Sequence, residues 1–248
     1  MALIDKPTTS LKKADVGGAE VKISDTAQNY LLTLHQLFEE RIRMSPSNLA
    51  TYIREATFGT KIGGTLPSVL SMVRRMARDG LLVLRPDKEI RFTAWGWQVT
   101  EQTVRRHRIA ECLVVTMLGL ELPMAHIEAH RLEHAISHEL EGLIVEKLGY
   151  PTVDPFGCPI PGSGYEQPAK GLMPLSDALA DSTYKIHRIP EANPELTRFM
   201  VDYEILPGKL IKVLETGQFR GVLVFVTTAG EAALGYDSVA RIWVEGPI

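Results

Sequence analysis

The segment AHIEAHRLEHAISHE carries four histidines at intervals of four residues: His126, His130, His134 and His138. An interval of four places side chains on one face of an α-helix, so the spacing predicts a helix with a row of imidazoles along one side. Neutral imidazole and carboxylate are ligands that suit first-row divalent metal ions. Five of the chain's seven histidines lie between residues 107 and 138. A solvated polar face would explain a lone histidine, but this concentration favours a metal site.

A second cluster of the same chemistry precedes the first by about five helical turns, in the motif HRIAE. His107 and Glu111 are again four residues apart, and Glu133 stands beside His134 in the later cluster. The sequence therefore predicts metal ligands, both imidazole and carboxylate, on two separate helical segments.

The composition is that of an ordinary globular protein of one to three domains, with 248 residues, 45% hydrophobic and 23% charged. Two cysteines, Cys112 and Cys158, do not make a disulfide framework, so a reducing cytoplasm is the expected location. No apolar run approaches the roughly eighteen residues of a membrane span, so no membrane partner is expected. Residues 1–23 lack the apolar centre of a secretory signal and predict a mobile polar arm.

The net charge of −3 conceals a strong asymmetry along the chain. Between Arg41 and Ala110 there are thirteen Lys and Arg residues against five Asp and Glu, so the remainder of the chain is strongly acidic. This segregation predicts that one region meets a polyanion such as nucleic acid. A basic face that is merely solvated is the alternative.

The basic region has the pattern of three helices followed by a hairpin. Helical periodicity or start and stop signals mark residues 26–41, 45–55 and 66–79. Two extended stretches, 81–87 and 88–93, follow and are joined by a Pro-Asp turn. This order predicts a winged helix-turn-helix, in which the third helix enters the major groove and the hairpin flanks the backbone.

The rest of the chain predicts a helical segment and then a small β-domain. Residues 95–148 are nearly all helical in pattern, and their apolar residues fit a bundle core, a dimer interface or both. The Pro- and Gly-rich stretch 149–171 predicts a linker. Beyond it, four short strands predict a small β-barrel; they cover residues 184–189, 209–216, 221–228 and 240–246.

The order of winged helix, HRIAE, AHIEAHRLEH and DPFGCPIPG before a small β-domain resembles the diphtheria toxin repressor family of iron- and manganese-dependent regulators. The resemblance covers roughly residues 24 to 248. It implies a mostly α fold with a small β part: a winged helix-turn-helix domain (24–98), a helical metal-binding and dimerisation domain (99–163) and an SH3-like, FeoA-type barrel (164–248). It also implies a homodimer that binds double-stranded operator DNA.

The resemblance implies two metal sites. An ancillary site would contain His107, Glu111, His126 and a side chain of the β-domain, for which Glu191, Asn193 and Glu195 are all candidates.

The primary, activating site would contain Asn29, His130, Glu133 and His134. Asn29 and His130 stand where iron-type members have Met and Cys and where manganese-type members often have Asp and Glu. This set has no sulfur, so Fe(II) or Mn(II) is the expected cofactor, although ligand affinity alone would also admit zinc, cobalt or nickel.

The resemblance also places DNA contacts on the third helix. Thr65, Pro67, Ser68 and Ser71 match base-facing positions, whose small hydroxyl groups give limited sequence readout. Arg74 and Arg75 are expected to contact phosphates, which gives affinity without sequence information. The connection before this helix is longer than a usual helix-turn-helix turn. Either the second helix runs on to Phe58, or GTKIGG is an inserted loop.

Two other classes of protein compete with a metal-activated repressor. HRLEH, residues 130–134, matches the H-x-x-E-H pattern of some zinc metallopeptidases, but that fold needs a distant third ligand and a large catalytic domain. A metal-independent winged-helix protein is the other. The sequence favours a non-enzymatic, homodimeric repressor. A metal bonded both to Asn29 and to the histidine-rich segment would fix the spacing of two recognition helices.

Overall fold

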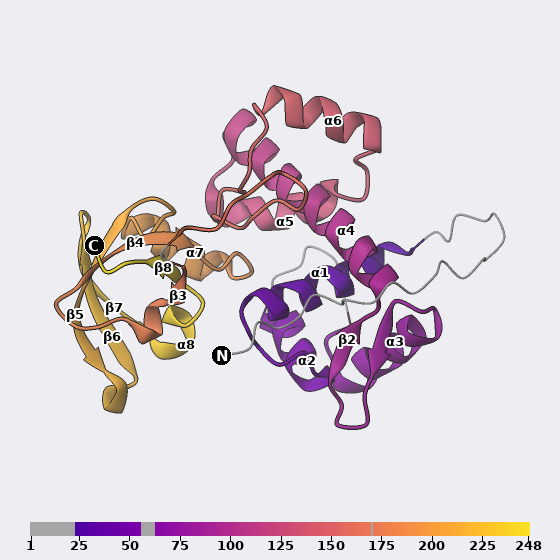
Figure 1. Ribbon diagram of the computed structural model, residues 1–248, viewed down its shortest axis with the longest axis horizontal. Coiled ribbons are helices and arrows are strands. Elements are labelled where there is room, and N and C mark those ends of the chain that lie inside the picture. The colour runs from indigo at the N-terminus through magenta and orange to yellow at the C-terminus, as the bar shows by residue number, and fades with distance from the viewer. Residues whose placement is uncertain (1–22, 56–62, 170) are drawn as a thin grey trace. The chain divides into compact units, whose positions relative to one another are not determined.

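The computed structural model describes residues 23–55, 63–169 and 171–248 (Figure 1). The chain divides into two compact units, with the boundary between Arg106 and His107. The first unit contains helices α1 (Asp25–Glu39), α2 (Pro46–Glu55) and α3 (Leu66–Arg78). The three predicted helices are therefore confirmed to within a few residues at each end.

Local sequence signals start these helices where the structure has them. Ser24 caps α1 by accepting a hydrogen bond from the Ala27 amide, and Thr65 caps α3 in the same way through the Ser68 amide. Helix α3 buries Val69, Val73 and Met76, which recur on one face, and leaves the opposite face in solvent.

The wing is a two-stranded antiparallel hairpin of β1 (Leu82–Leu84) and β2 (Ile90–Phe92). It leads directly into the long helix α4 (Ala94–Cys112), whose start is capped by the Thr93 hydroxyl accepting from the Gly96 amide. Gly96 allows a close packing of helix and hairpin, because a Cβ there would lie 1.8 Å from the Leu81 carbonyl oxygen. The predicted winged helix is thus confirmed.

Two predictions fall on parts of the chain that the structure does not describe. The extension of the second helix to Phe58 and the GTKIGG loop both involve residues 56–62, and the polar arm involves residues 1–22. Both therefore lie outside the described residues.

The second unit begins with the last turn of α4 and a short π-helical turn, η1 (Leu113–Met117). Helices α5 (Leu122–Leu132) and α6 (His138–Lys147) follow. The prediction that all four spaced histidines share one helical face is wrong, because α5 ends at Leu132. Ser137 caps a new helix by accepting a hydrogen bond from the Leu140 amide, with Glu139 and Glu141 in its first turn. Consequently His138 is exposed, while His126 and His130 share the buried face of α5.

The stretch predicted as a linker contains a packed loop. The Asp154 side chain accepts hydrogen bonds from the amides of Phe156 and Cys158. Val153 and Pro159 form an isolated antiparallel β-bridge. Gly157 adopts a left-handed conformation (φ 85°), and a Cβ there would lie 2.0 Å from the His187 carbonyl oxygen. The loop therefore packs closely against the β-domain.

The β-domain is one antiparallel sheet with the strand order β3-β8-β4-β5-β6-β7. Alternate residues of its central strands, such as Ile186, Val213 and Phe225, form a buried core that also contains Phe156. The small β-domain is confirmed, although the sheet stays open because β3 and β7 do not pair. The strands are β3 (Met173–Pro174), β4 (Thr183–Arg188), β5 (Leu210–Gly217), β6 (Val222–Thr227), β7 (Gly230–Gly235) and β8 (Trp243–Glu245).

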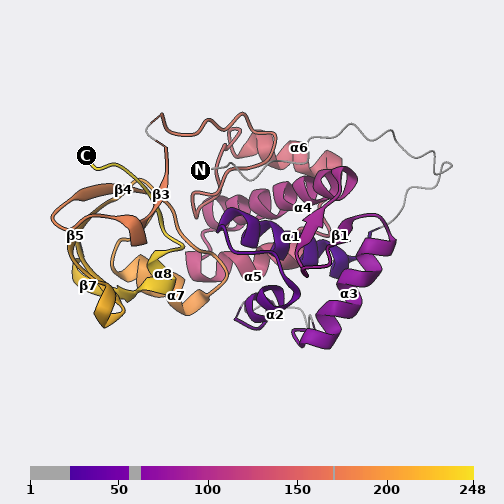
Figure 2. The same ribbon diagram turned by 60° about the horizontal axis from the view of Figure 1, so that its bottom comes forward.

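Short helices complete the β-domain. Figure 2 shows α7 (Pro194–Asp202) and α8 (Tyr236–Val239) beside the sheet. Two 3-10 turns, η2 (Leu175–Asp177) and η3 (Gln218–Arg220), connect strands. No helix among the described residues is both long enough and apolar enough to span a bilayer.

Candidate metal centre and nucleic-acid interface

His107, on the last turns of α4, lies at the centre of a buried polar cluster. Its Nδ1 is 2.6 Å from Glu133 Oε2, and its Nε2 is 3.0 Å from Glu111 Oε1 and 2.9 Å from His126 Nδ1. All four side chains are almost completely buried. The two clusters that are separate in sequence therefore meet at one histidine.

Glu133 also lies close to two further histidines of the segment. Its Oε1 lies 3.3 Å from His130 Nδ1 and 3.2 Å from His134 Nε2. The turn that ends α5 thus directs the Glu133 carboxylate back toward three imidazoles.

The β-domain contributes Glu191, which lies between β4 and α7. Glu191 Oε1 is 3.9 Å from His126 Nδ1, and ligand atoms of His107, Glu111, His126 and Glu191 all lie within 4.8 Å of one another. The structure therefore assembles the predicted ancillary set with Glu191 as its fourth member. A second overlapping group, His107, His126 and His130, meets the same distance limit.

Two other candidate residues lie elsewhere. Glu195 is exposed in the first turn of α7, and Asn193 caps that helix by accepting from the Leu196 amide. The geometry therefore favours Glu191 over both alternatives. Asn29 is a buried residue of α1, in the first unit, and its role as a ligand stays a prediction.

Burial and nearby charges have opposite effects on the pKa values of the residues in the cluster. Burial alone would lower the pKa of His107, but the charges of Glu111 and Glu133 together raise it well above its ordinary value. The pKa values of both carboxyls are lowered, because the His107 charge outweighs their burial. Burial lowers the pKa of His130 to about 3. Burial therefore favours the neutral form of His130, and the two carboxylates favour the protonated form of His107.

A neighbouring group of buried residues was missed by the sequence reasoning. Donor atoms of Asp154, Cys158 and Glu191 lie within 4.8 Å of one another, and Arg108 Nε is 3.4 Å from Asp154 Oδ2. Burial, and after it nearby negative charge, holds the pKa values of Asp154 and Cys158 well above their usual ranges. The sequence signal was the motif DPFGC itself, which served only to support the resemblance and the linker prediction.

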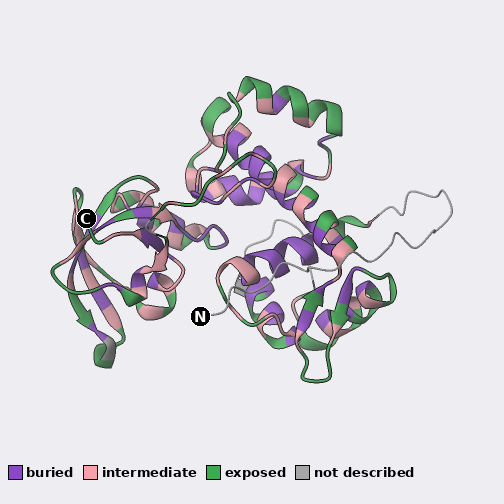
Figure 3. Cartoon of the chain, in the orientation of Figure 1, coloured by how far each residue is buried: buried purple, intermediate pink, exposed green. Residues whose placement is uncertain are grey.

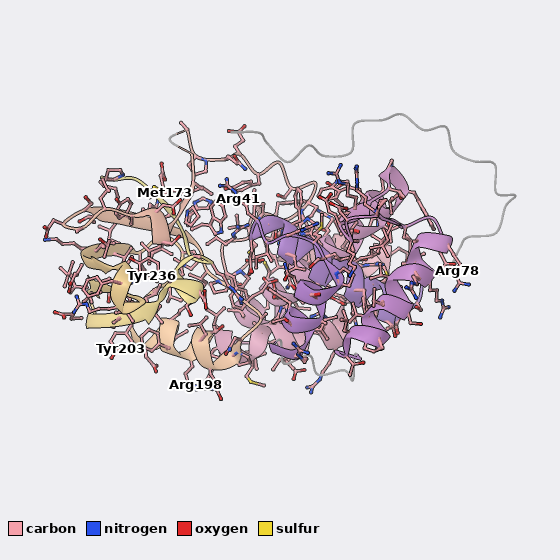
Figure 4. The ribbon with its side chains drawn as sticks, turned by 90° about the horizontal axis from the view of Figure 1, so that it is seen from below. Arg41, Arg78, Met173, Arg198, Tyr203 and Tyr236 are labelled. Atoms are coloured by element: carbon pink, nitrogen blue, oxygen red, sulfur yellow. The ribbon has the colours of Figure 1, made fainter. Side chains whose placement is uncertain are left out.

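The outward face of α3 holds every residue predicted to contact DNA. Thr65, Pro67, Ser68, Ser71, Arg74 and Arg75 are all exposed. A groove of about 480 Å³ runs between α3 and the wing, lined by Pro67, Ser71, Arg74, Ala77, Arg78 and Leu84. Figure 4 shows Arg78 pointing outward from α3. The wing adds further exposed cations, at Arg85, Lys88 and Arg91.

A winged helix and a buried imidazole–carboxylate cluster in one chain are the components of a metal-responsive DNA-binding protein. Comparison with known families gives the same result. A family profile described as the iron dependent repressor, metal binding and dimerisation domain matches residues 93–162, and the FeoA domain matches residues 173–246.

The chain belongs to the diphtheria toxin repressor family of iron-dependent repressors. It is 36% identical over 236 residues to the iron-dependent repressor IdeR of Mycobacterium tuberculosis strain H37Rv, covering 90% of this chain and 98% of the relative. It is 30% identical over 228 residues to the diphtheria toxin repressor of Corynebacterium glutamicum, covering 88% and 94%.

The fold agrees with that of a solved relative. A manganese-dependent transcriptional repressor in complex with manganese superposes with a TM-score of 0.75 and 29% identity, covering 89% of this chain and 99% of the other.

Proposed function

We propose that this chain is a metal-dependent transcriptional repressor that binds operator DNA as a homodimer. The observation that carries the proposal is the buried cluster around His107, in a chain that also contains a winged helix. Membership of the repressor family supports the same function. Its work on DNA makes the cytoplasm the expected location.

The residues present fit a divalent cation. Glu111, Glu133 and Glu191 are buried carboxylates, and Glu111 Oε2 accepts no hydrogen bond within the described part of the chain. Burying unbalanced charge is costly unless a cation accompanies it. A bound metal ion would supply that positive charge together with directional bonds to nitrogen and oxygen.

Distances support the proposed histidine and glutamate ligands, while Asn29 is included because of the family resemblance. His107, Glu111, His126 and Glu191 hold one ion. His130, Glu133 and His134 hold the activating ion together with Asn29. These nitrogen and oxygen ligands suit Fe(II) or Mn(II), although they would also take zinc, cobalt or nickel in vitro. Through Asn29 the activating ion ties the DNA-binding unit to the histidine-rich segment, so metal and operator favour the same conformation.

The proposed DNA-binding surface is the outer face of α3 with the adjoining wing. Ser68 and Ser71 face the bases, where a hydroxyl reads several base pairs weakly. Arg74 and Arg75 bind phosphates, since a guanidinium suits phosphate geometry. The positive surplus of this region is consistent with both roles.

The proposed dimer interface lies on the helical part of the second unit. Figure 3 shows α6 exposed along most of its length. Large apolar side chains on α6 and at the end of η1 face solvent, at Met117, Leu118, Leu140 and Leu143. Several large apolar side chains exposed on one helical segment are typical of an interaction site, and the matching family profile is described as a dimerisation domain.

Operator binding measured with and without metal tests the proposal. Duplexes selected from a random pool by the manganese-loaded protein would be titrated by fluorescence anisotropy in Mn(II) and in chelator. We expect tight binding only with metal, and His134→Ala, which removes a proposed ligand of the activating ion, to abolish the response. His138→Ala is the matched control, because His138 is exposed and outside the cluster. Tight binding that ignores chelator would contradict the proposal.

The metallopeptidase alternative receives no support. The relatives reported above are named as repressors, and in this fold Glu133 lies among three imidazoles rather than facing an open cleft.

A further inference from the structure

The chain buries a thiol and two carboxylates together beside the histidine cluster. Asp154, Cys158 and Glu191 are 4%, 5% and 6% exposed, and their donor atoms lie within 4.8 Å of one another. Glu191 also belongs to the group around His107. The two groups of potential ligands therefore share one carboxylate.

The loop from Asp154 to Cys158 orients these donor atoms. Asp154 Oδ1 accepts hydrogen bonds from the amides of Phe156 and Cys158, at 2.8 and 2.9 Å. Asp154 Oδ2 is buried and accepts no hydrogen bond from the described residues, and its nearest cation, Arg108 Nε, is 3.4 Å away. The Cys158 sulfur likewise forms no hydrogen bond with the described residues. A carboxylate oxygen and a thiol are thus buried together without hydrogen bonds.

We propose that Asp154, Cys158 and Glu191 form a further metal position, which takes a thiophilic divalent ion such as Zn²⁺ or Co²⁺. It goes beyond the proposed function, which assigns the metal to the histidine cluster alone. Binding breaks the Cys158 S–H bond, releases its proton to solvent and forms a sulfur–metal bond, with no change of oxidation state.

The ligand types and the charge balance support this position. Thiolate selects zinc and its analogues over Mn²⁺, which prefers oxygen. Asp154, the Cys158 thiolate and Glu191 carry three negative charges, and Glu191 shares its charge with the histidine cluster. One divalent ion and the Arg108 guanidinium are therefore enough to balance this group. Arg108 therefore need not leave when the ion enters. The sequence-based expectation that the primary site lacks sulfur is unaffected, because Cys158 lies outside that set.

Cobalt spectroscopy tests the proposal directly. Titration of the metal-free protein with Co(II) should produce a near-ultraviolet charge-transfer band from sulfur to cobalt. The Cys158→Ser variant should lose this band. Cys112→Ser is the matched control, because Cys112 is the other buried free cysteine and should leave the band intact. Asp154→Asn should retain the band but raise the cobalt concentration needed by at least about tenfold, as expected for loss of an anionic ligand.

Two further measurements keep the test decisive. If Cys158→Ser fails to fold, X-ray absorption of the zinc-loaded wild-type protein should show a sulfur neighbour at about 2.3 Å. A wild-type protein without sulfur at cobalt or zinc, or a folded Cys158→Ser variant that keeps the band, would overturn the inference. Manganese-dependent operator binding, and its loss in His134→Ala, tests the histidine cluster separately. Failure of either idea can therefore be distinguished from failure of the other.

Discussion

His107 holds a proton where the fold has gathered negative charge. Its ring nitrogens face Glu133 at 2.6 Å and Glu111 at 3.0 Å, and this pairing raises its pKa. A metal ion can bind His107 only after that proton leaves. Proton and metal therefore compete for the same ring.

We predict that stabilisation of the protein by Mn(II) grows as pH rises from about 6 to about 8. Because the folded pKa of His107 is raised, its imidazolium stabilises the metal-free fold fully below the unfolded value of about 6.5 and loses this effect as pH rises through the folded pKa. The affinity for the metal ion increases over the same pH interval, because the competing proton is lost from His107. The difference in Tm with and without Mn(II), measured at several pH values, checks this. The His107→Gln variant should show a flatter profile, and an equally steep one would contradict the assignment.

Positions 29 and 130 should set the ranking of metals. His130→Cys should raise the affinity for zinc and cobalt more than for manganese, because it adds a soft thiolate. Asn29→Asp should instead strengthen manganese binding by adding a hard anionic oxygen. Calorimetric titration of both variants against three metals measures the effect. An unchanged ranking in both would show that neither side chain is a ligand.

Sequence spacing predicted the residues of the histidine cluster, but it did not predict how they meet. The interval of four correctly placed His107 with Glu111 and His126 with His130. It failed at His138, because a capping serine outweighs continued periodicity. Asp154 and Cys158 were missed because a loop of the chain brings them to Glu191, and no local spacing encodes that contact.

At the scale of elements, α3 separates a buried face from a face available to DNA. Val69, Val73 and Met76 anchor the helix to the first unit, so the exposed side chains gain a fixed orientation. The sequence pattern of residues 66–79 was sufficient to predict this helix, whereas its DNA-facing residues were expected from the resemblance to the repressor family. The shape of the groove between α3 and the wing depends on the hairpin register and could not be predicted.

We predict that Arg74→Ala weakens binding to all duplexes about equally and reduces the slope of log affinity against log salt by about one. The reason is the loss of one phosphate contact, which carries no sequence information. Arg198→Ala is the matched control, because it removes the same charge from α7 of the β-domain, which is no part of the winged helix. Loss confined to one duplex sequence would instead indicate a base contact.

At the scale of the molecule, the helical part of the second unit leaves apolar side chains in solvent that a partner subunit would cover. Leu143 is 59% exposed on α6, and Leu118 is 70% exposed. The sequence indicated that this segment holds more apolar residues than one layer needs. It could not say which of them stay outside the core, since that depends on where α5 ends and α6 begins.

Leu143→Glu should therefore convert the dimer into a monomer and remove tight operator binding, because a buried carboxylate without a partner costs several kcal/mol. Light scattering coupled to size exclusion should show the mass halved. Leu210→Glu, at a 54% exposed leucine of β5, should leave both properties unchanged. A dimeric Leu143→Glu variant would place the interface elsewhere.

Glu191 lies close to the histidine cluster although the segment after Pro161 separates them in sequence. A metal ion bound by both His126 and Glu191 would close a long loop of the chain. Because the ion would then link the two ends of this loop, they would stay together even if the peptide between them were cut. Proteolytic cleavage between Gly162 and Ala169 should then leave two fragments that elute together while metal is bound. After chelation, only non-covalent contacts would hold them, chiefly the core that joins Val114, Ala125 and Phe156 to the β-domain. The proposed metal ion would thus act as a removable cross-link within the protein.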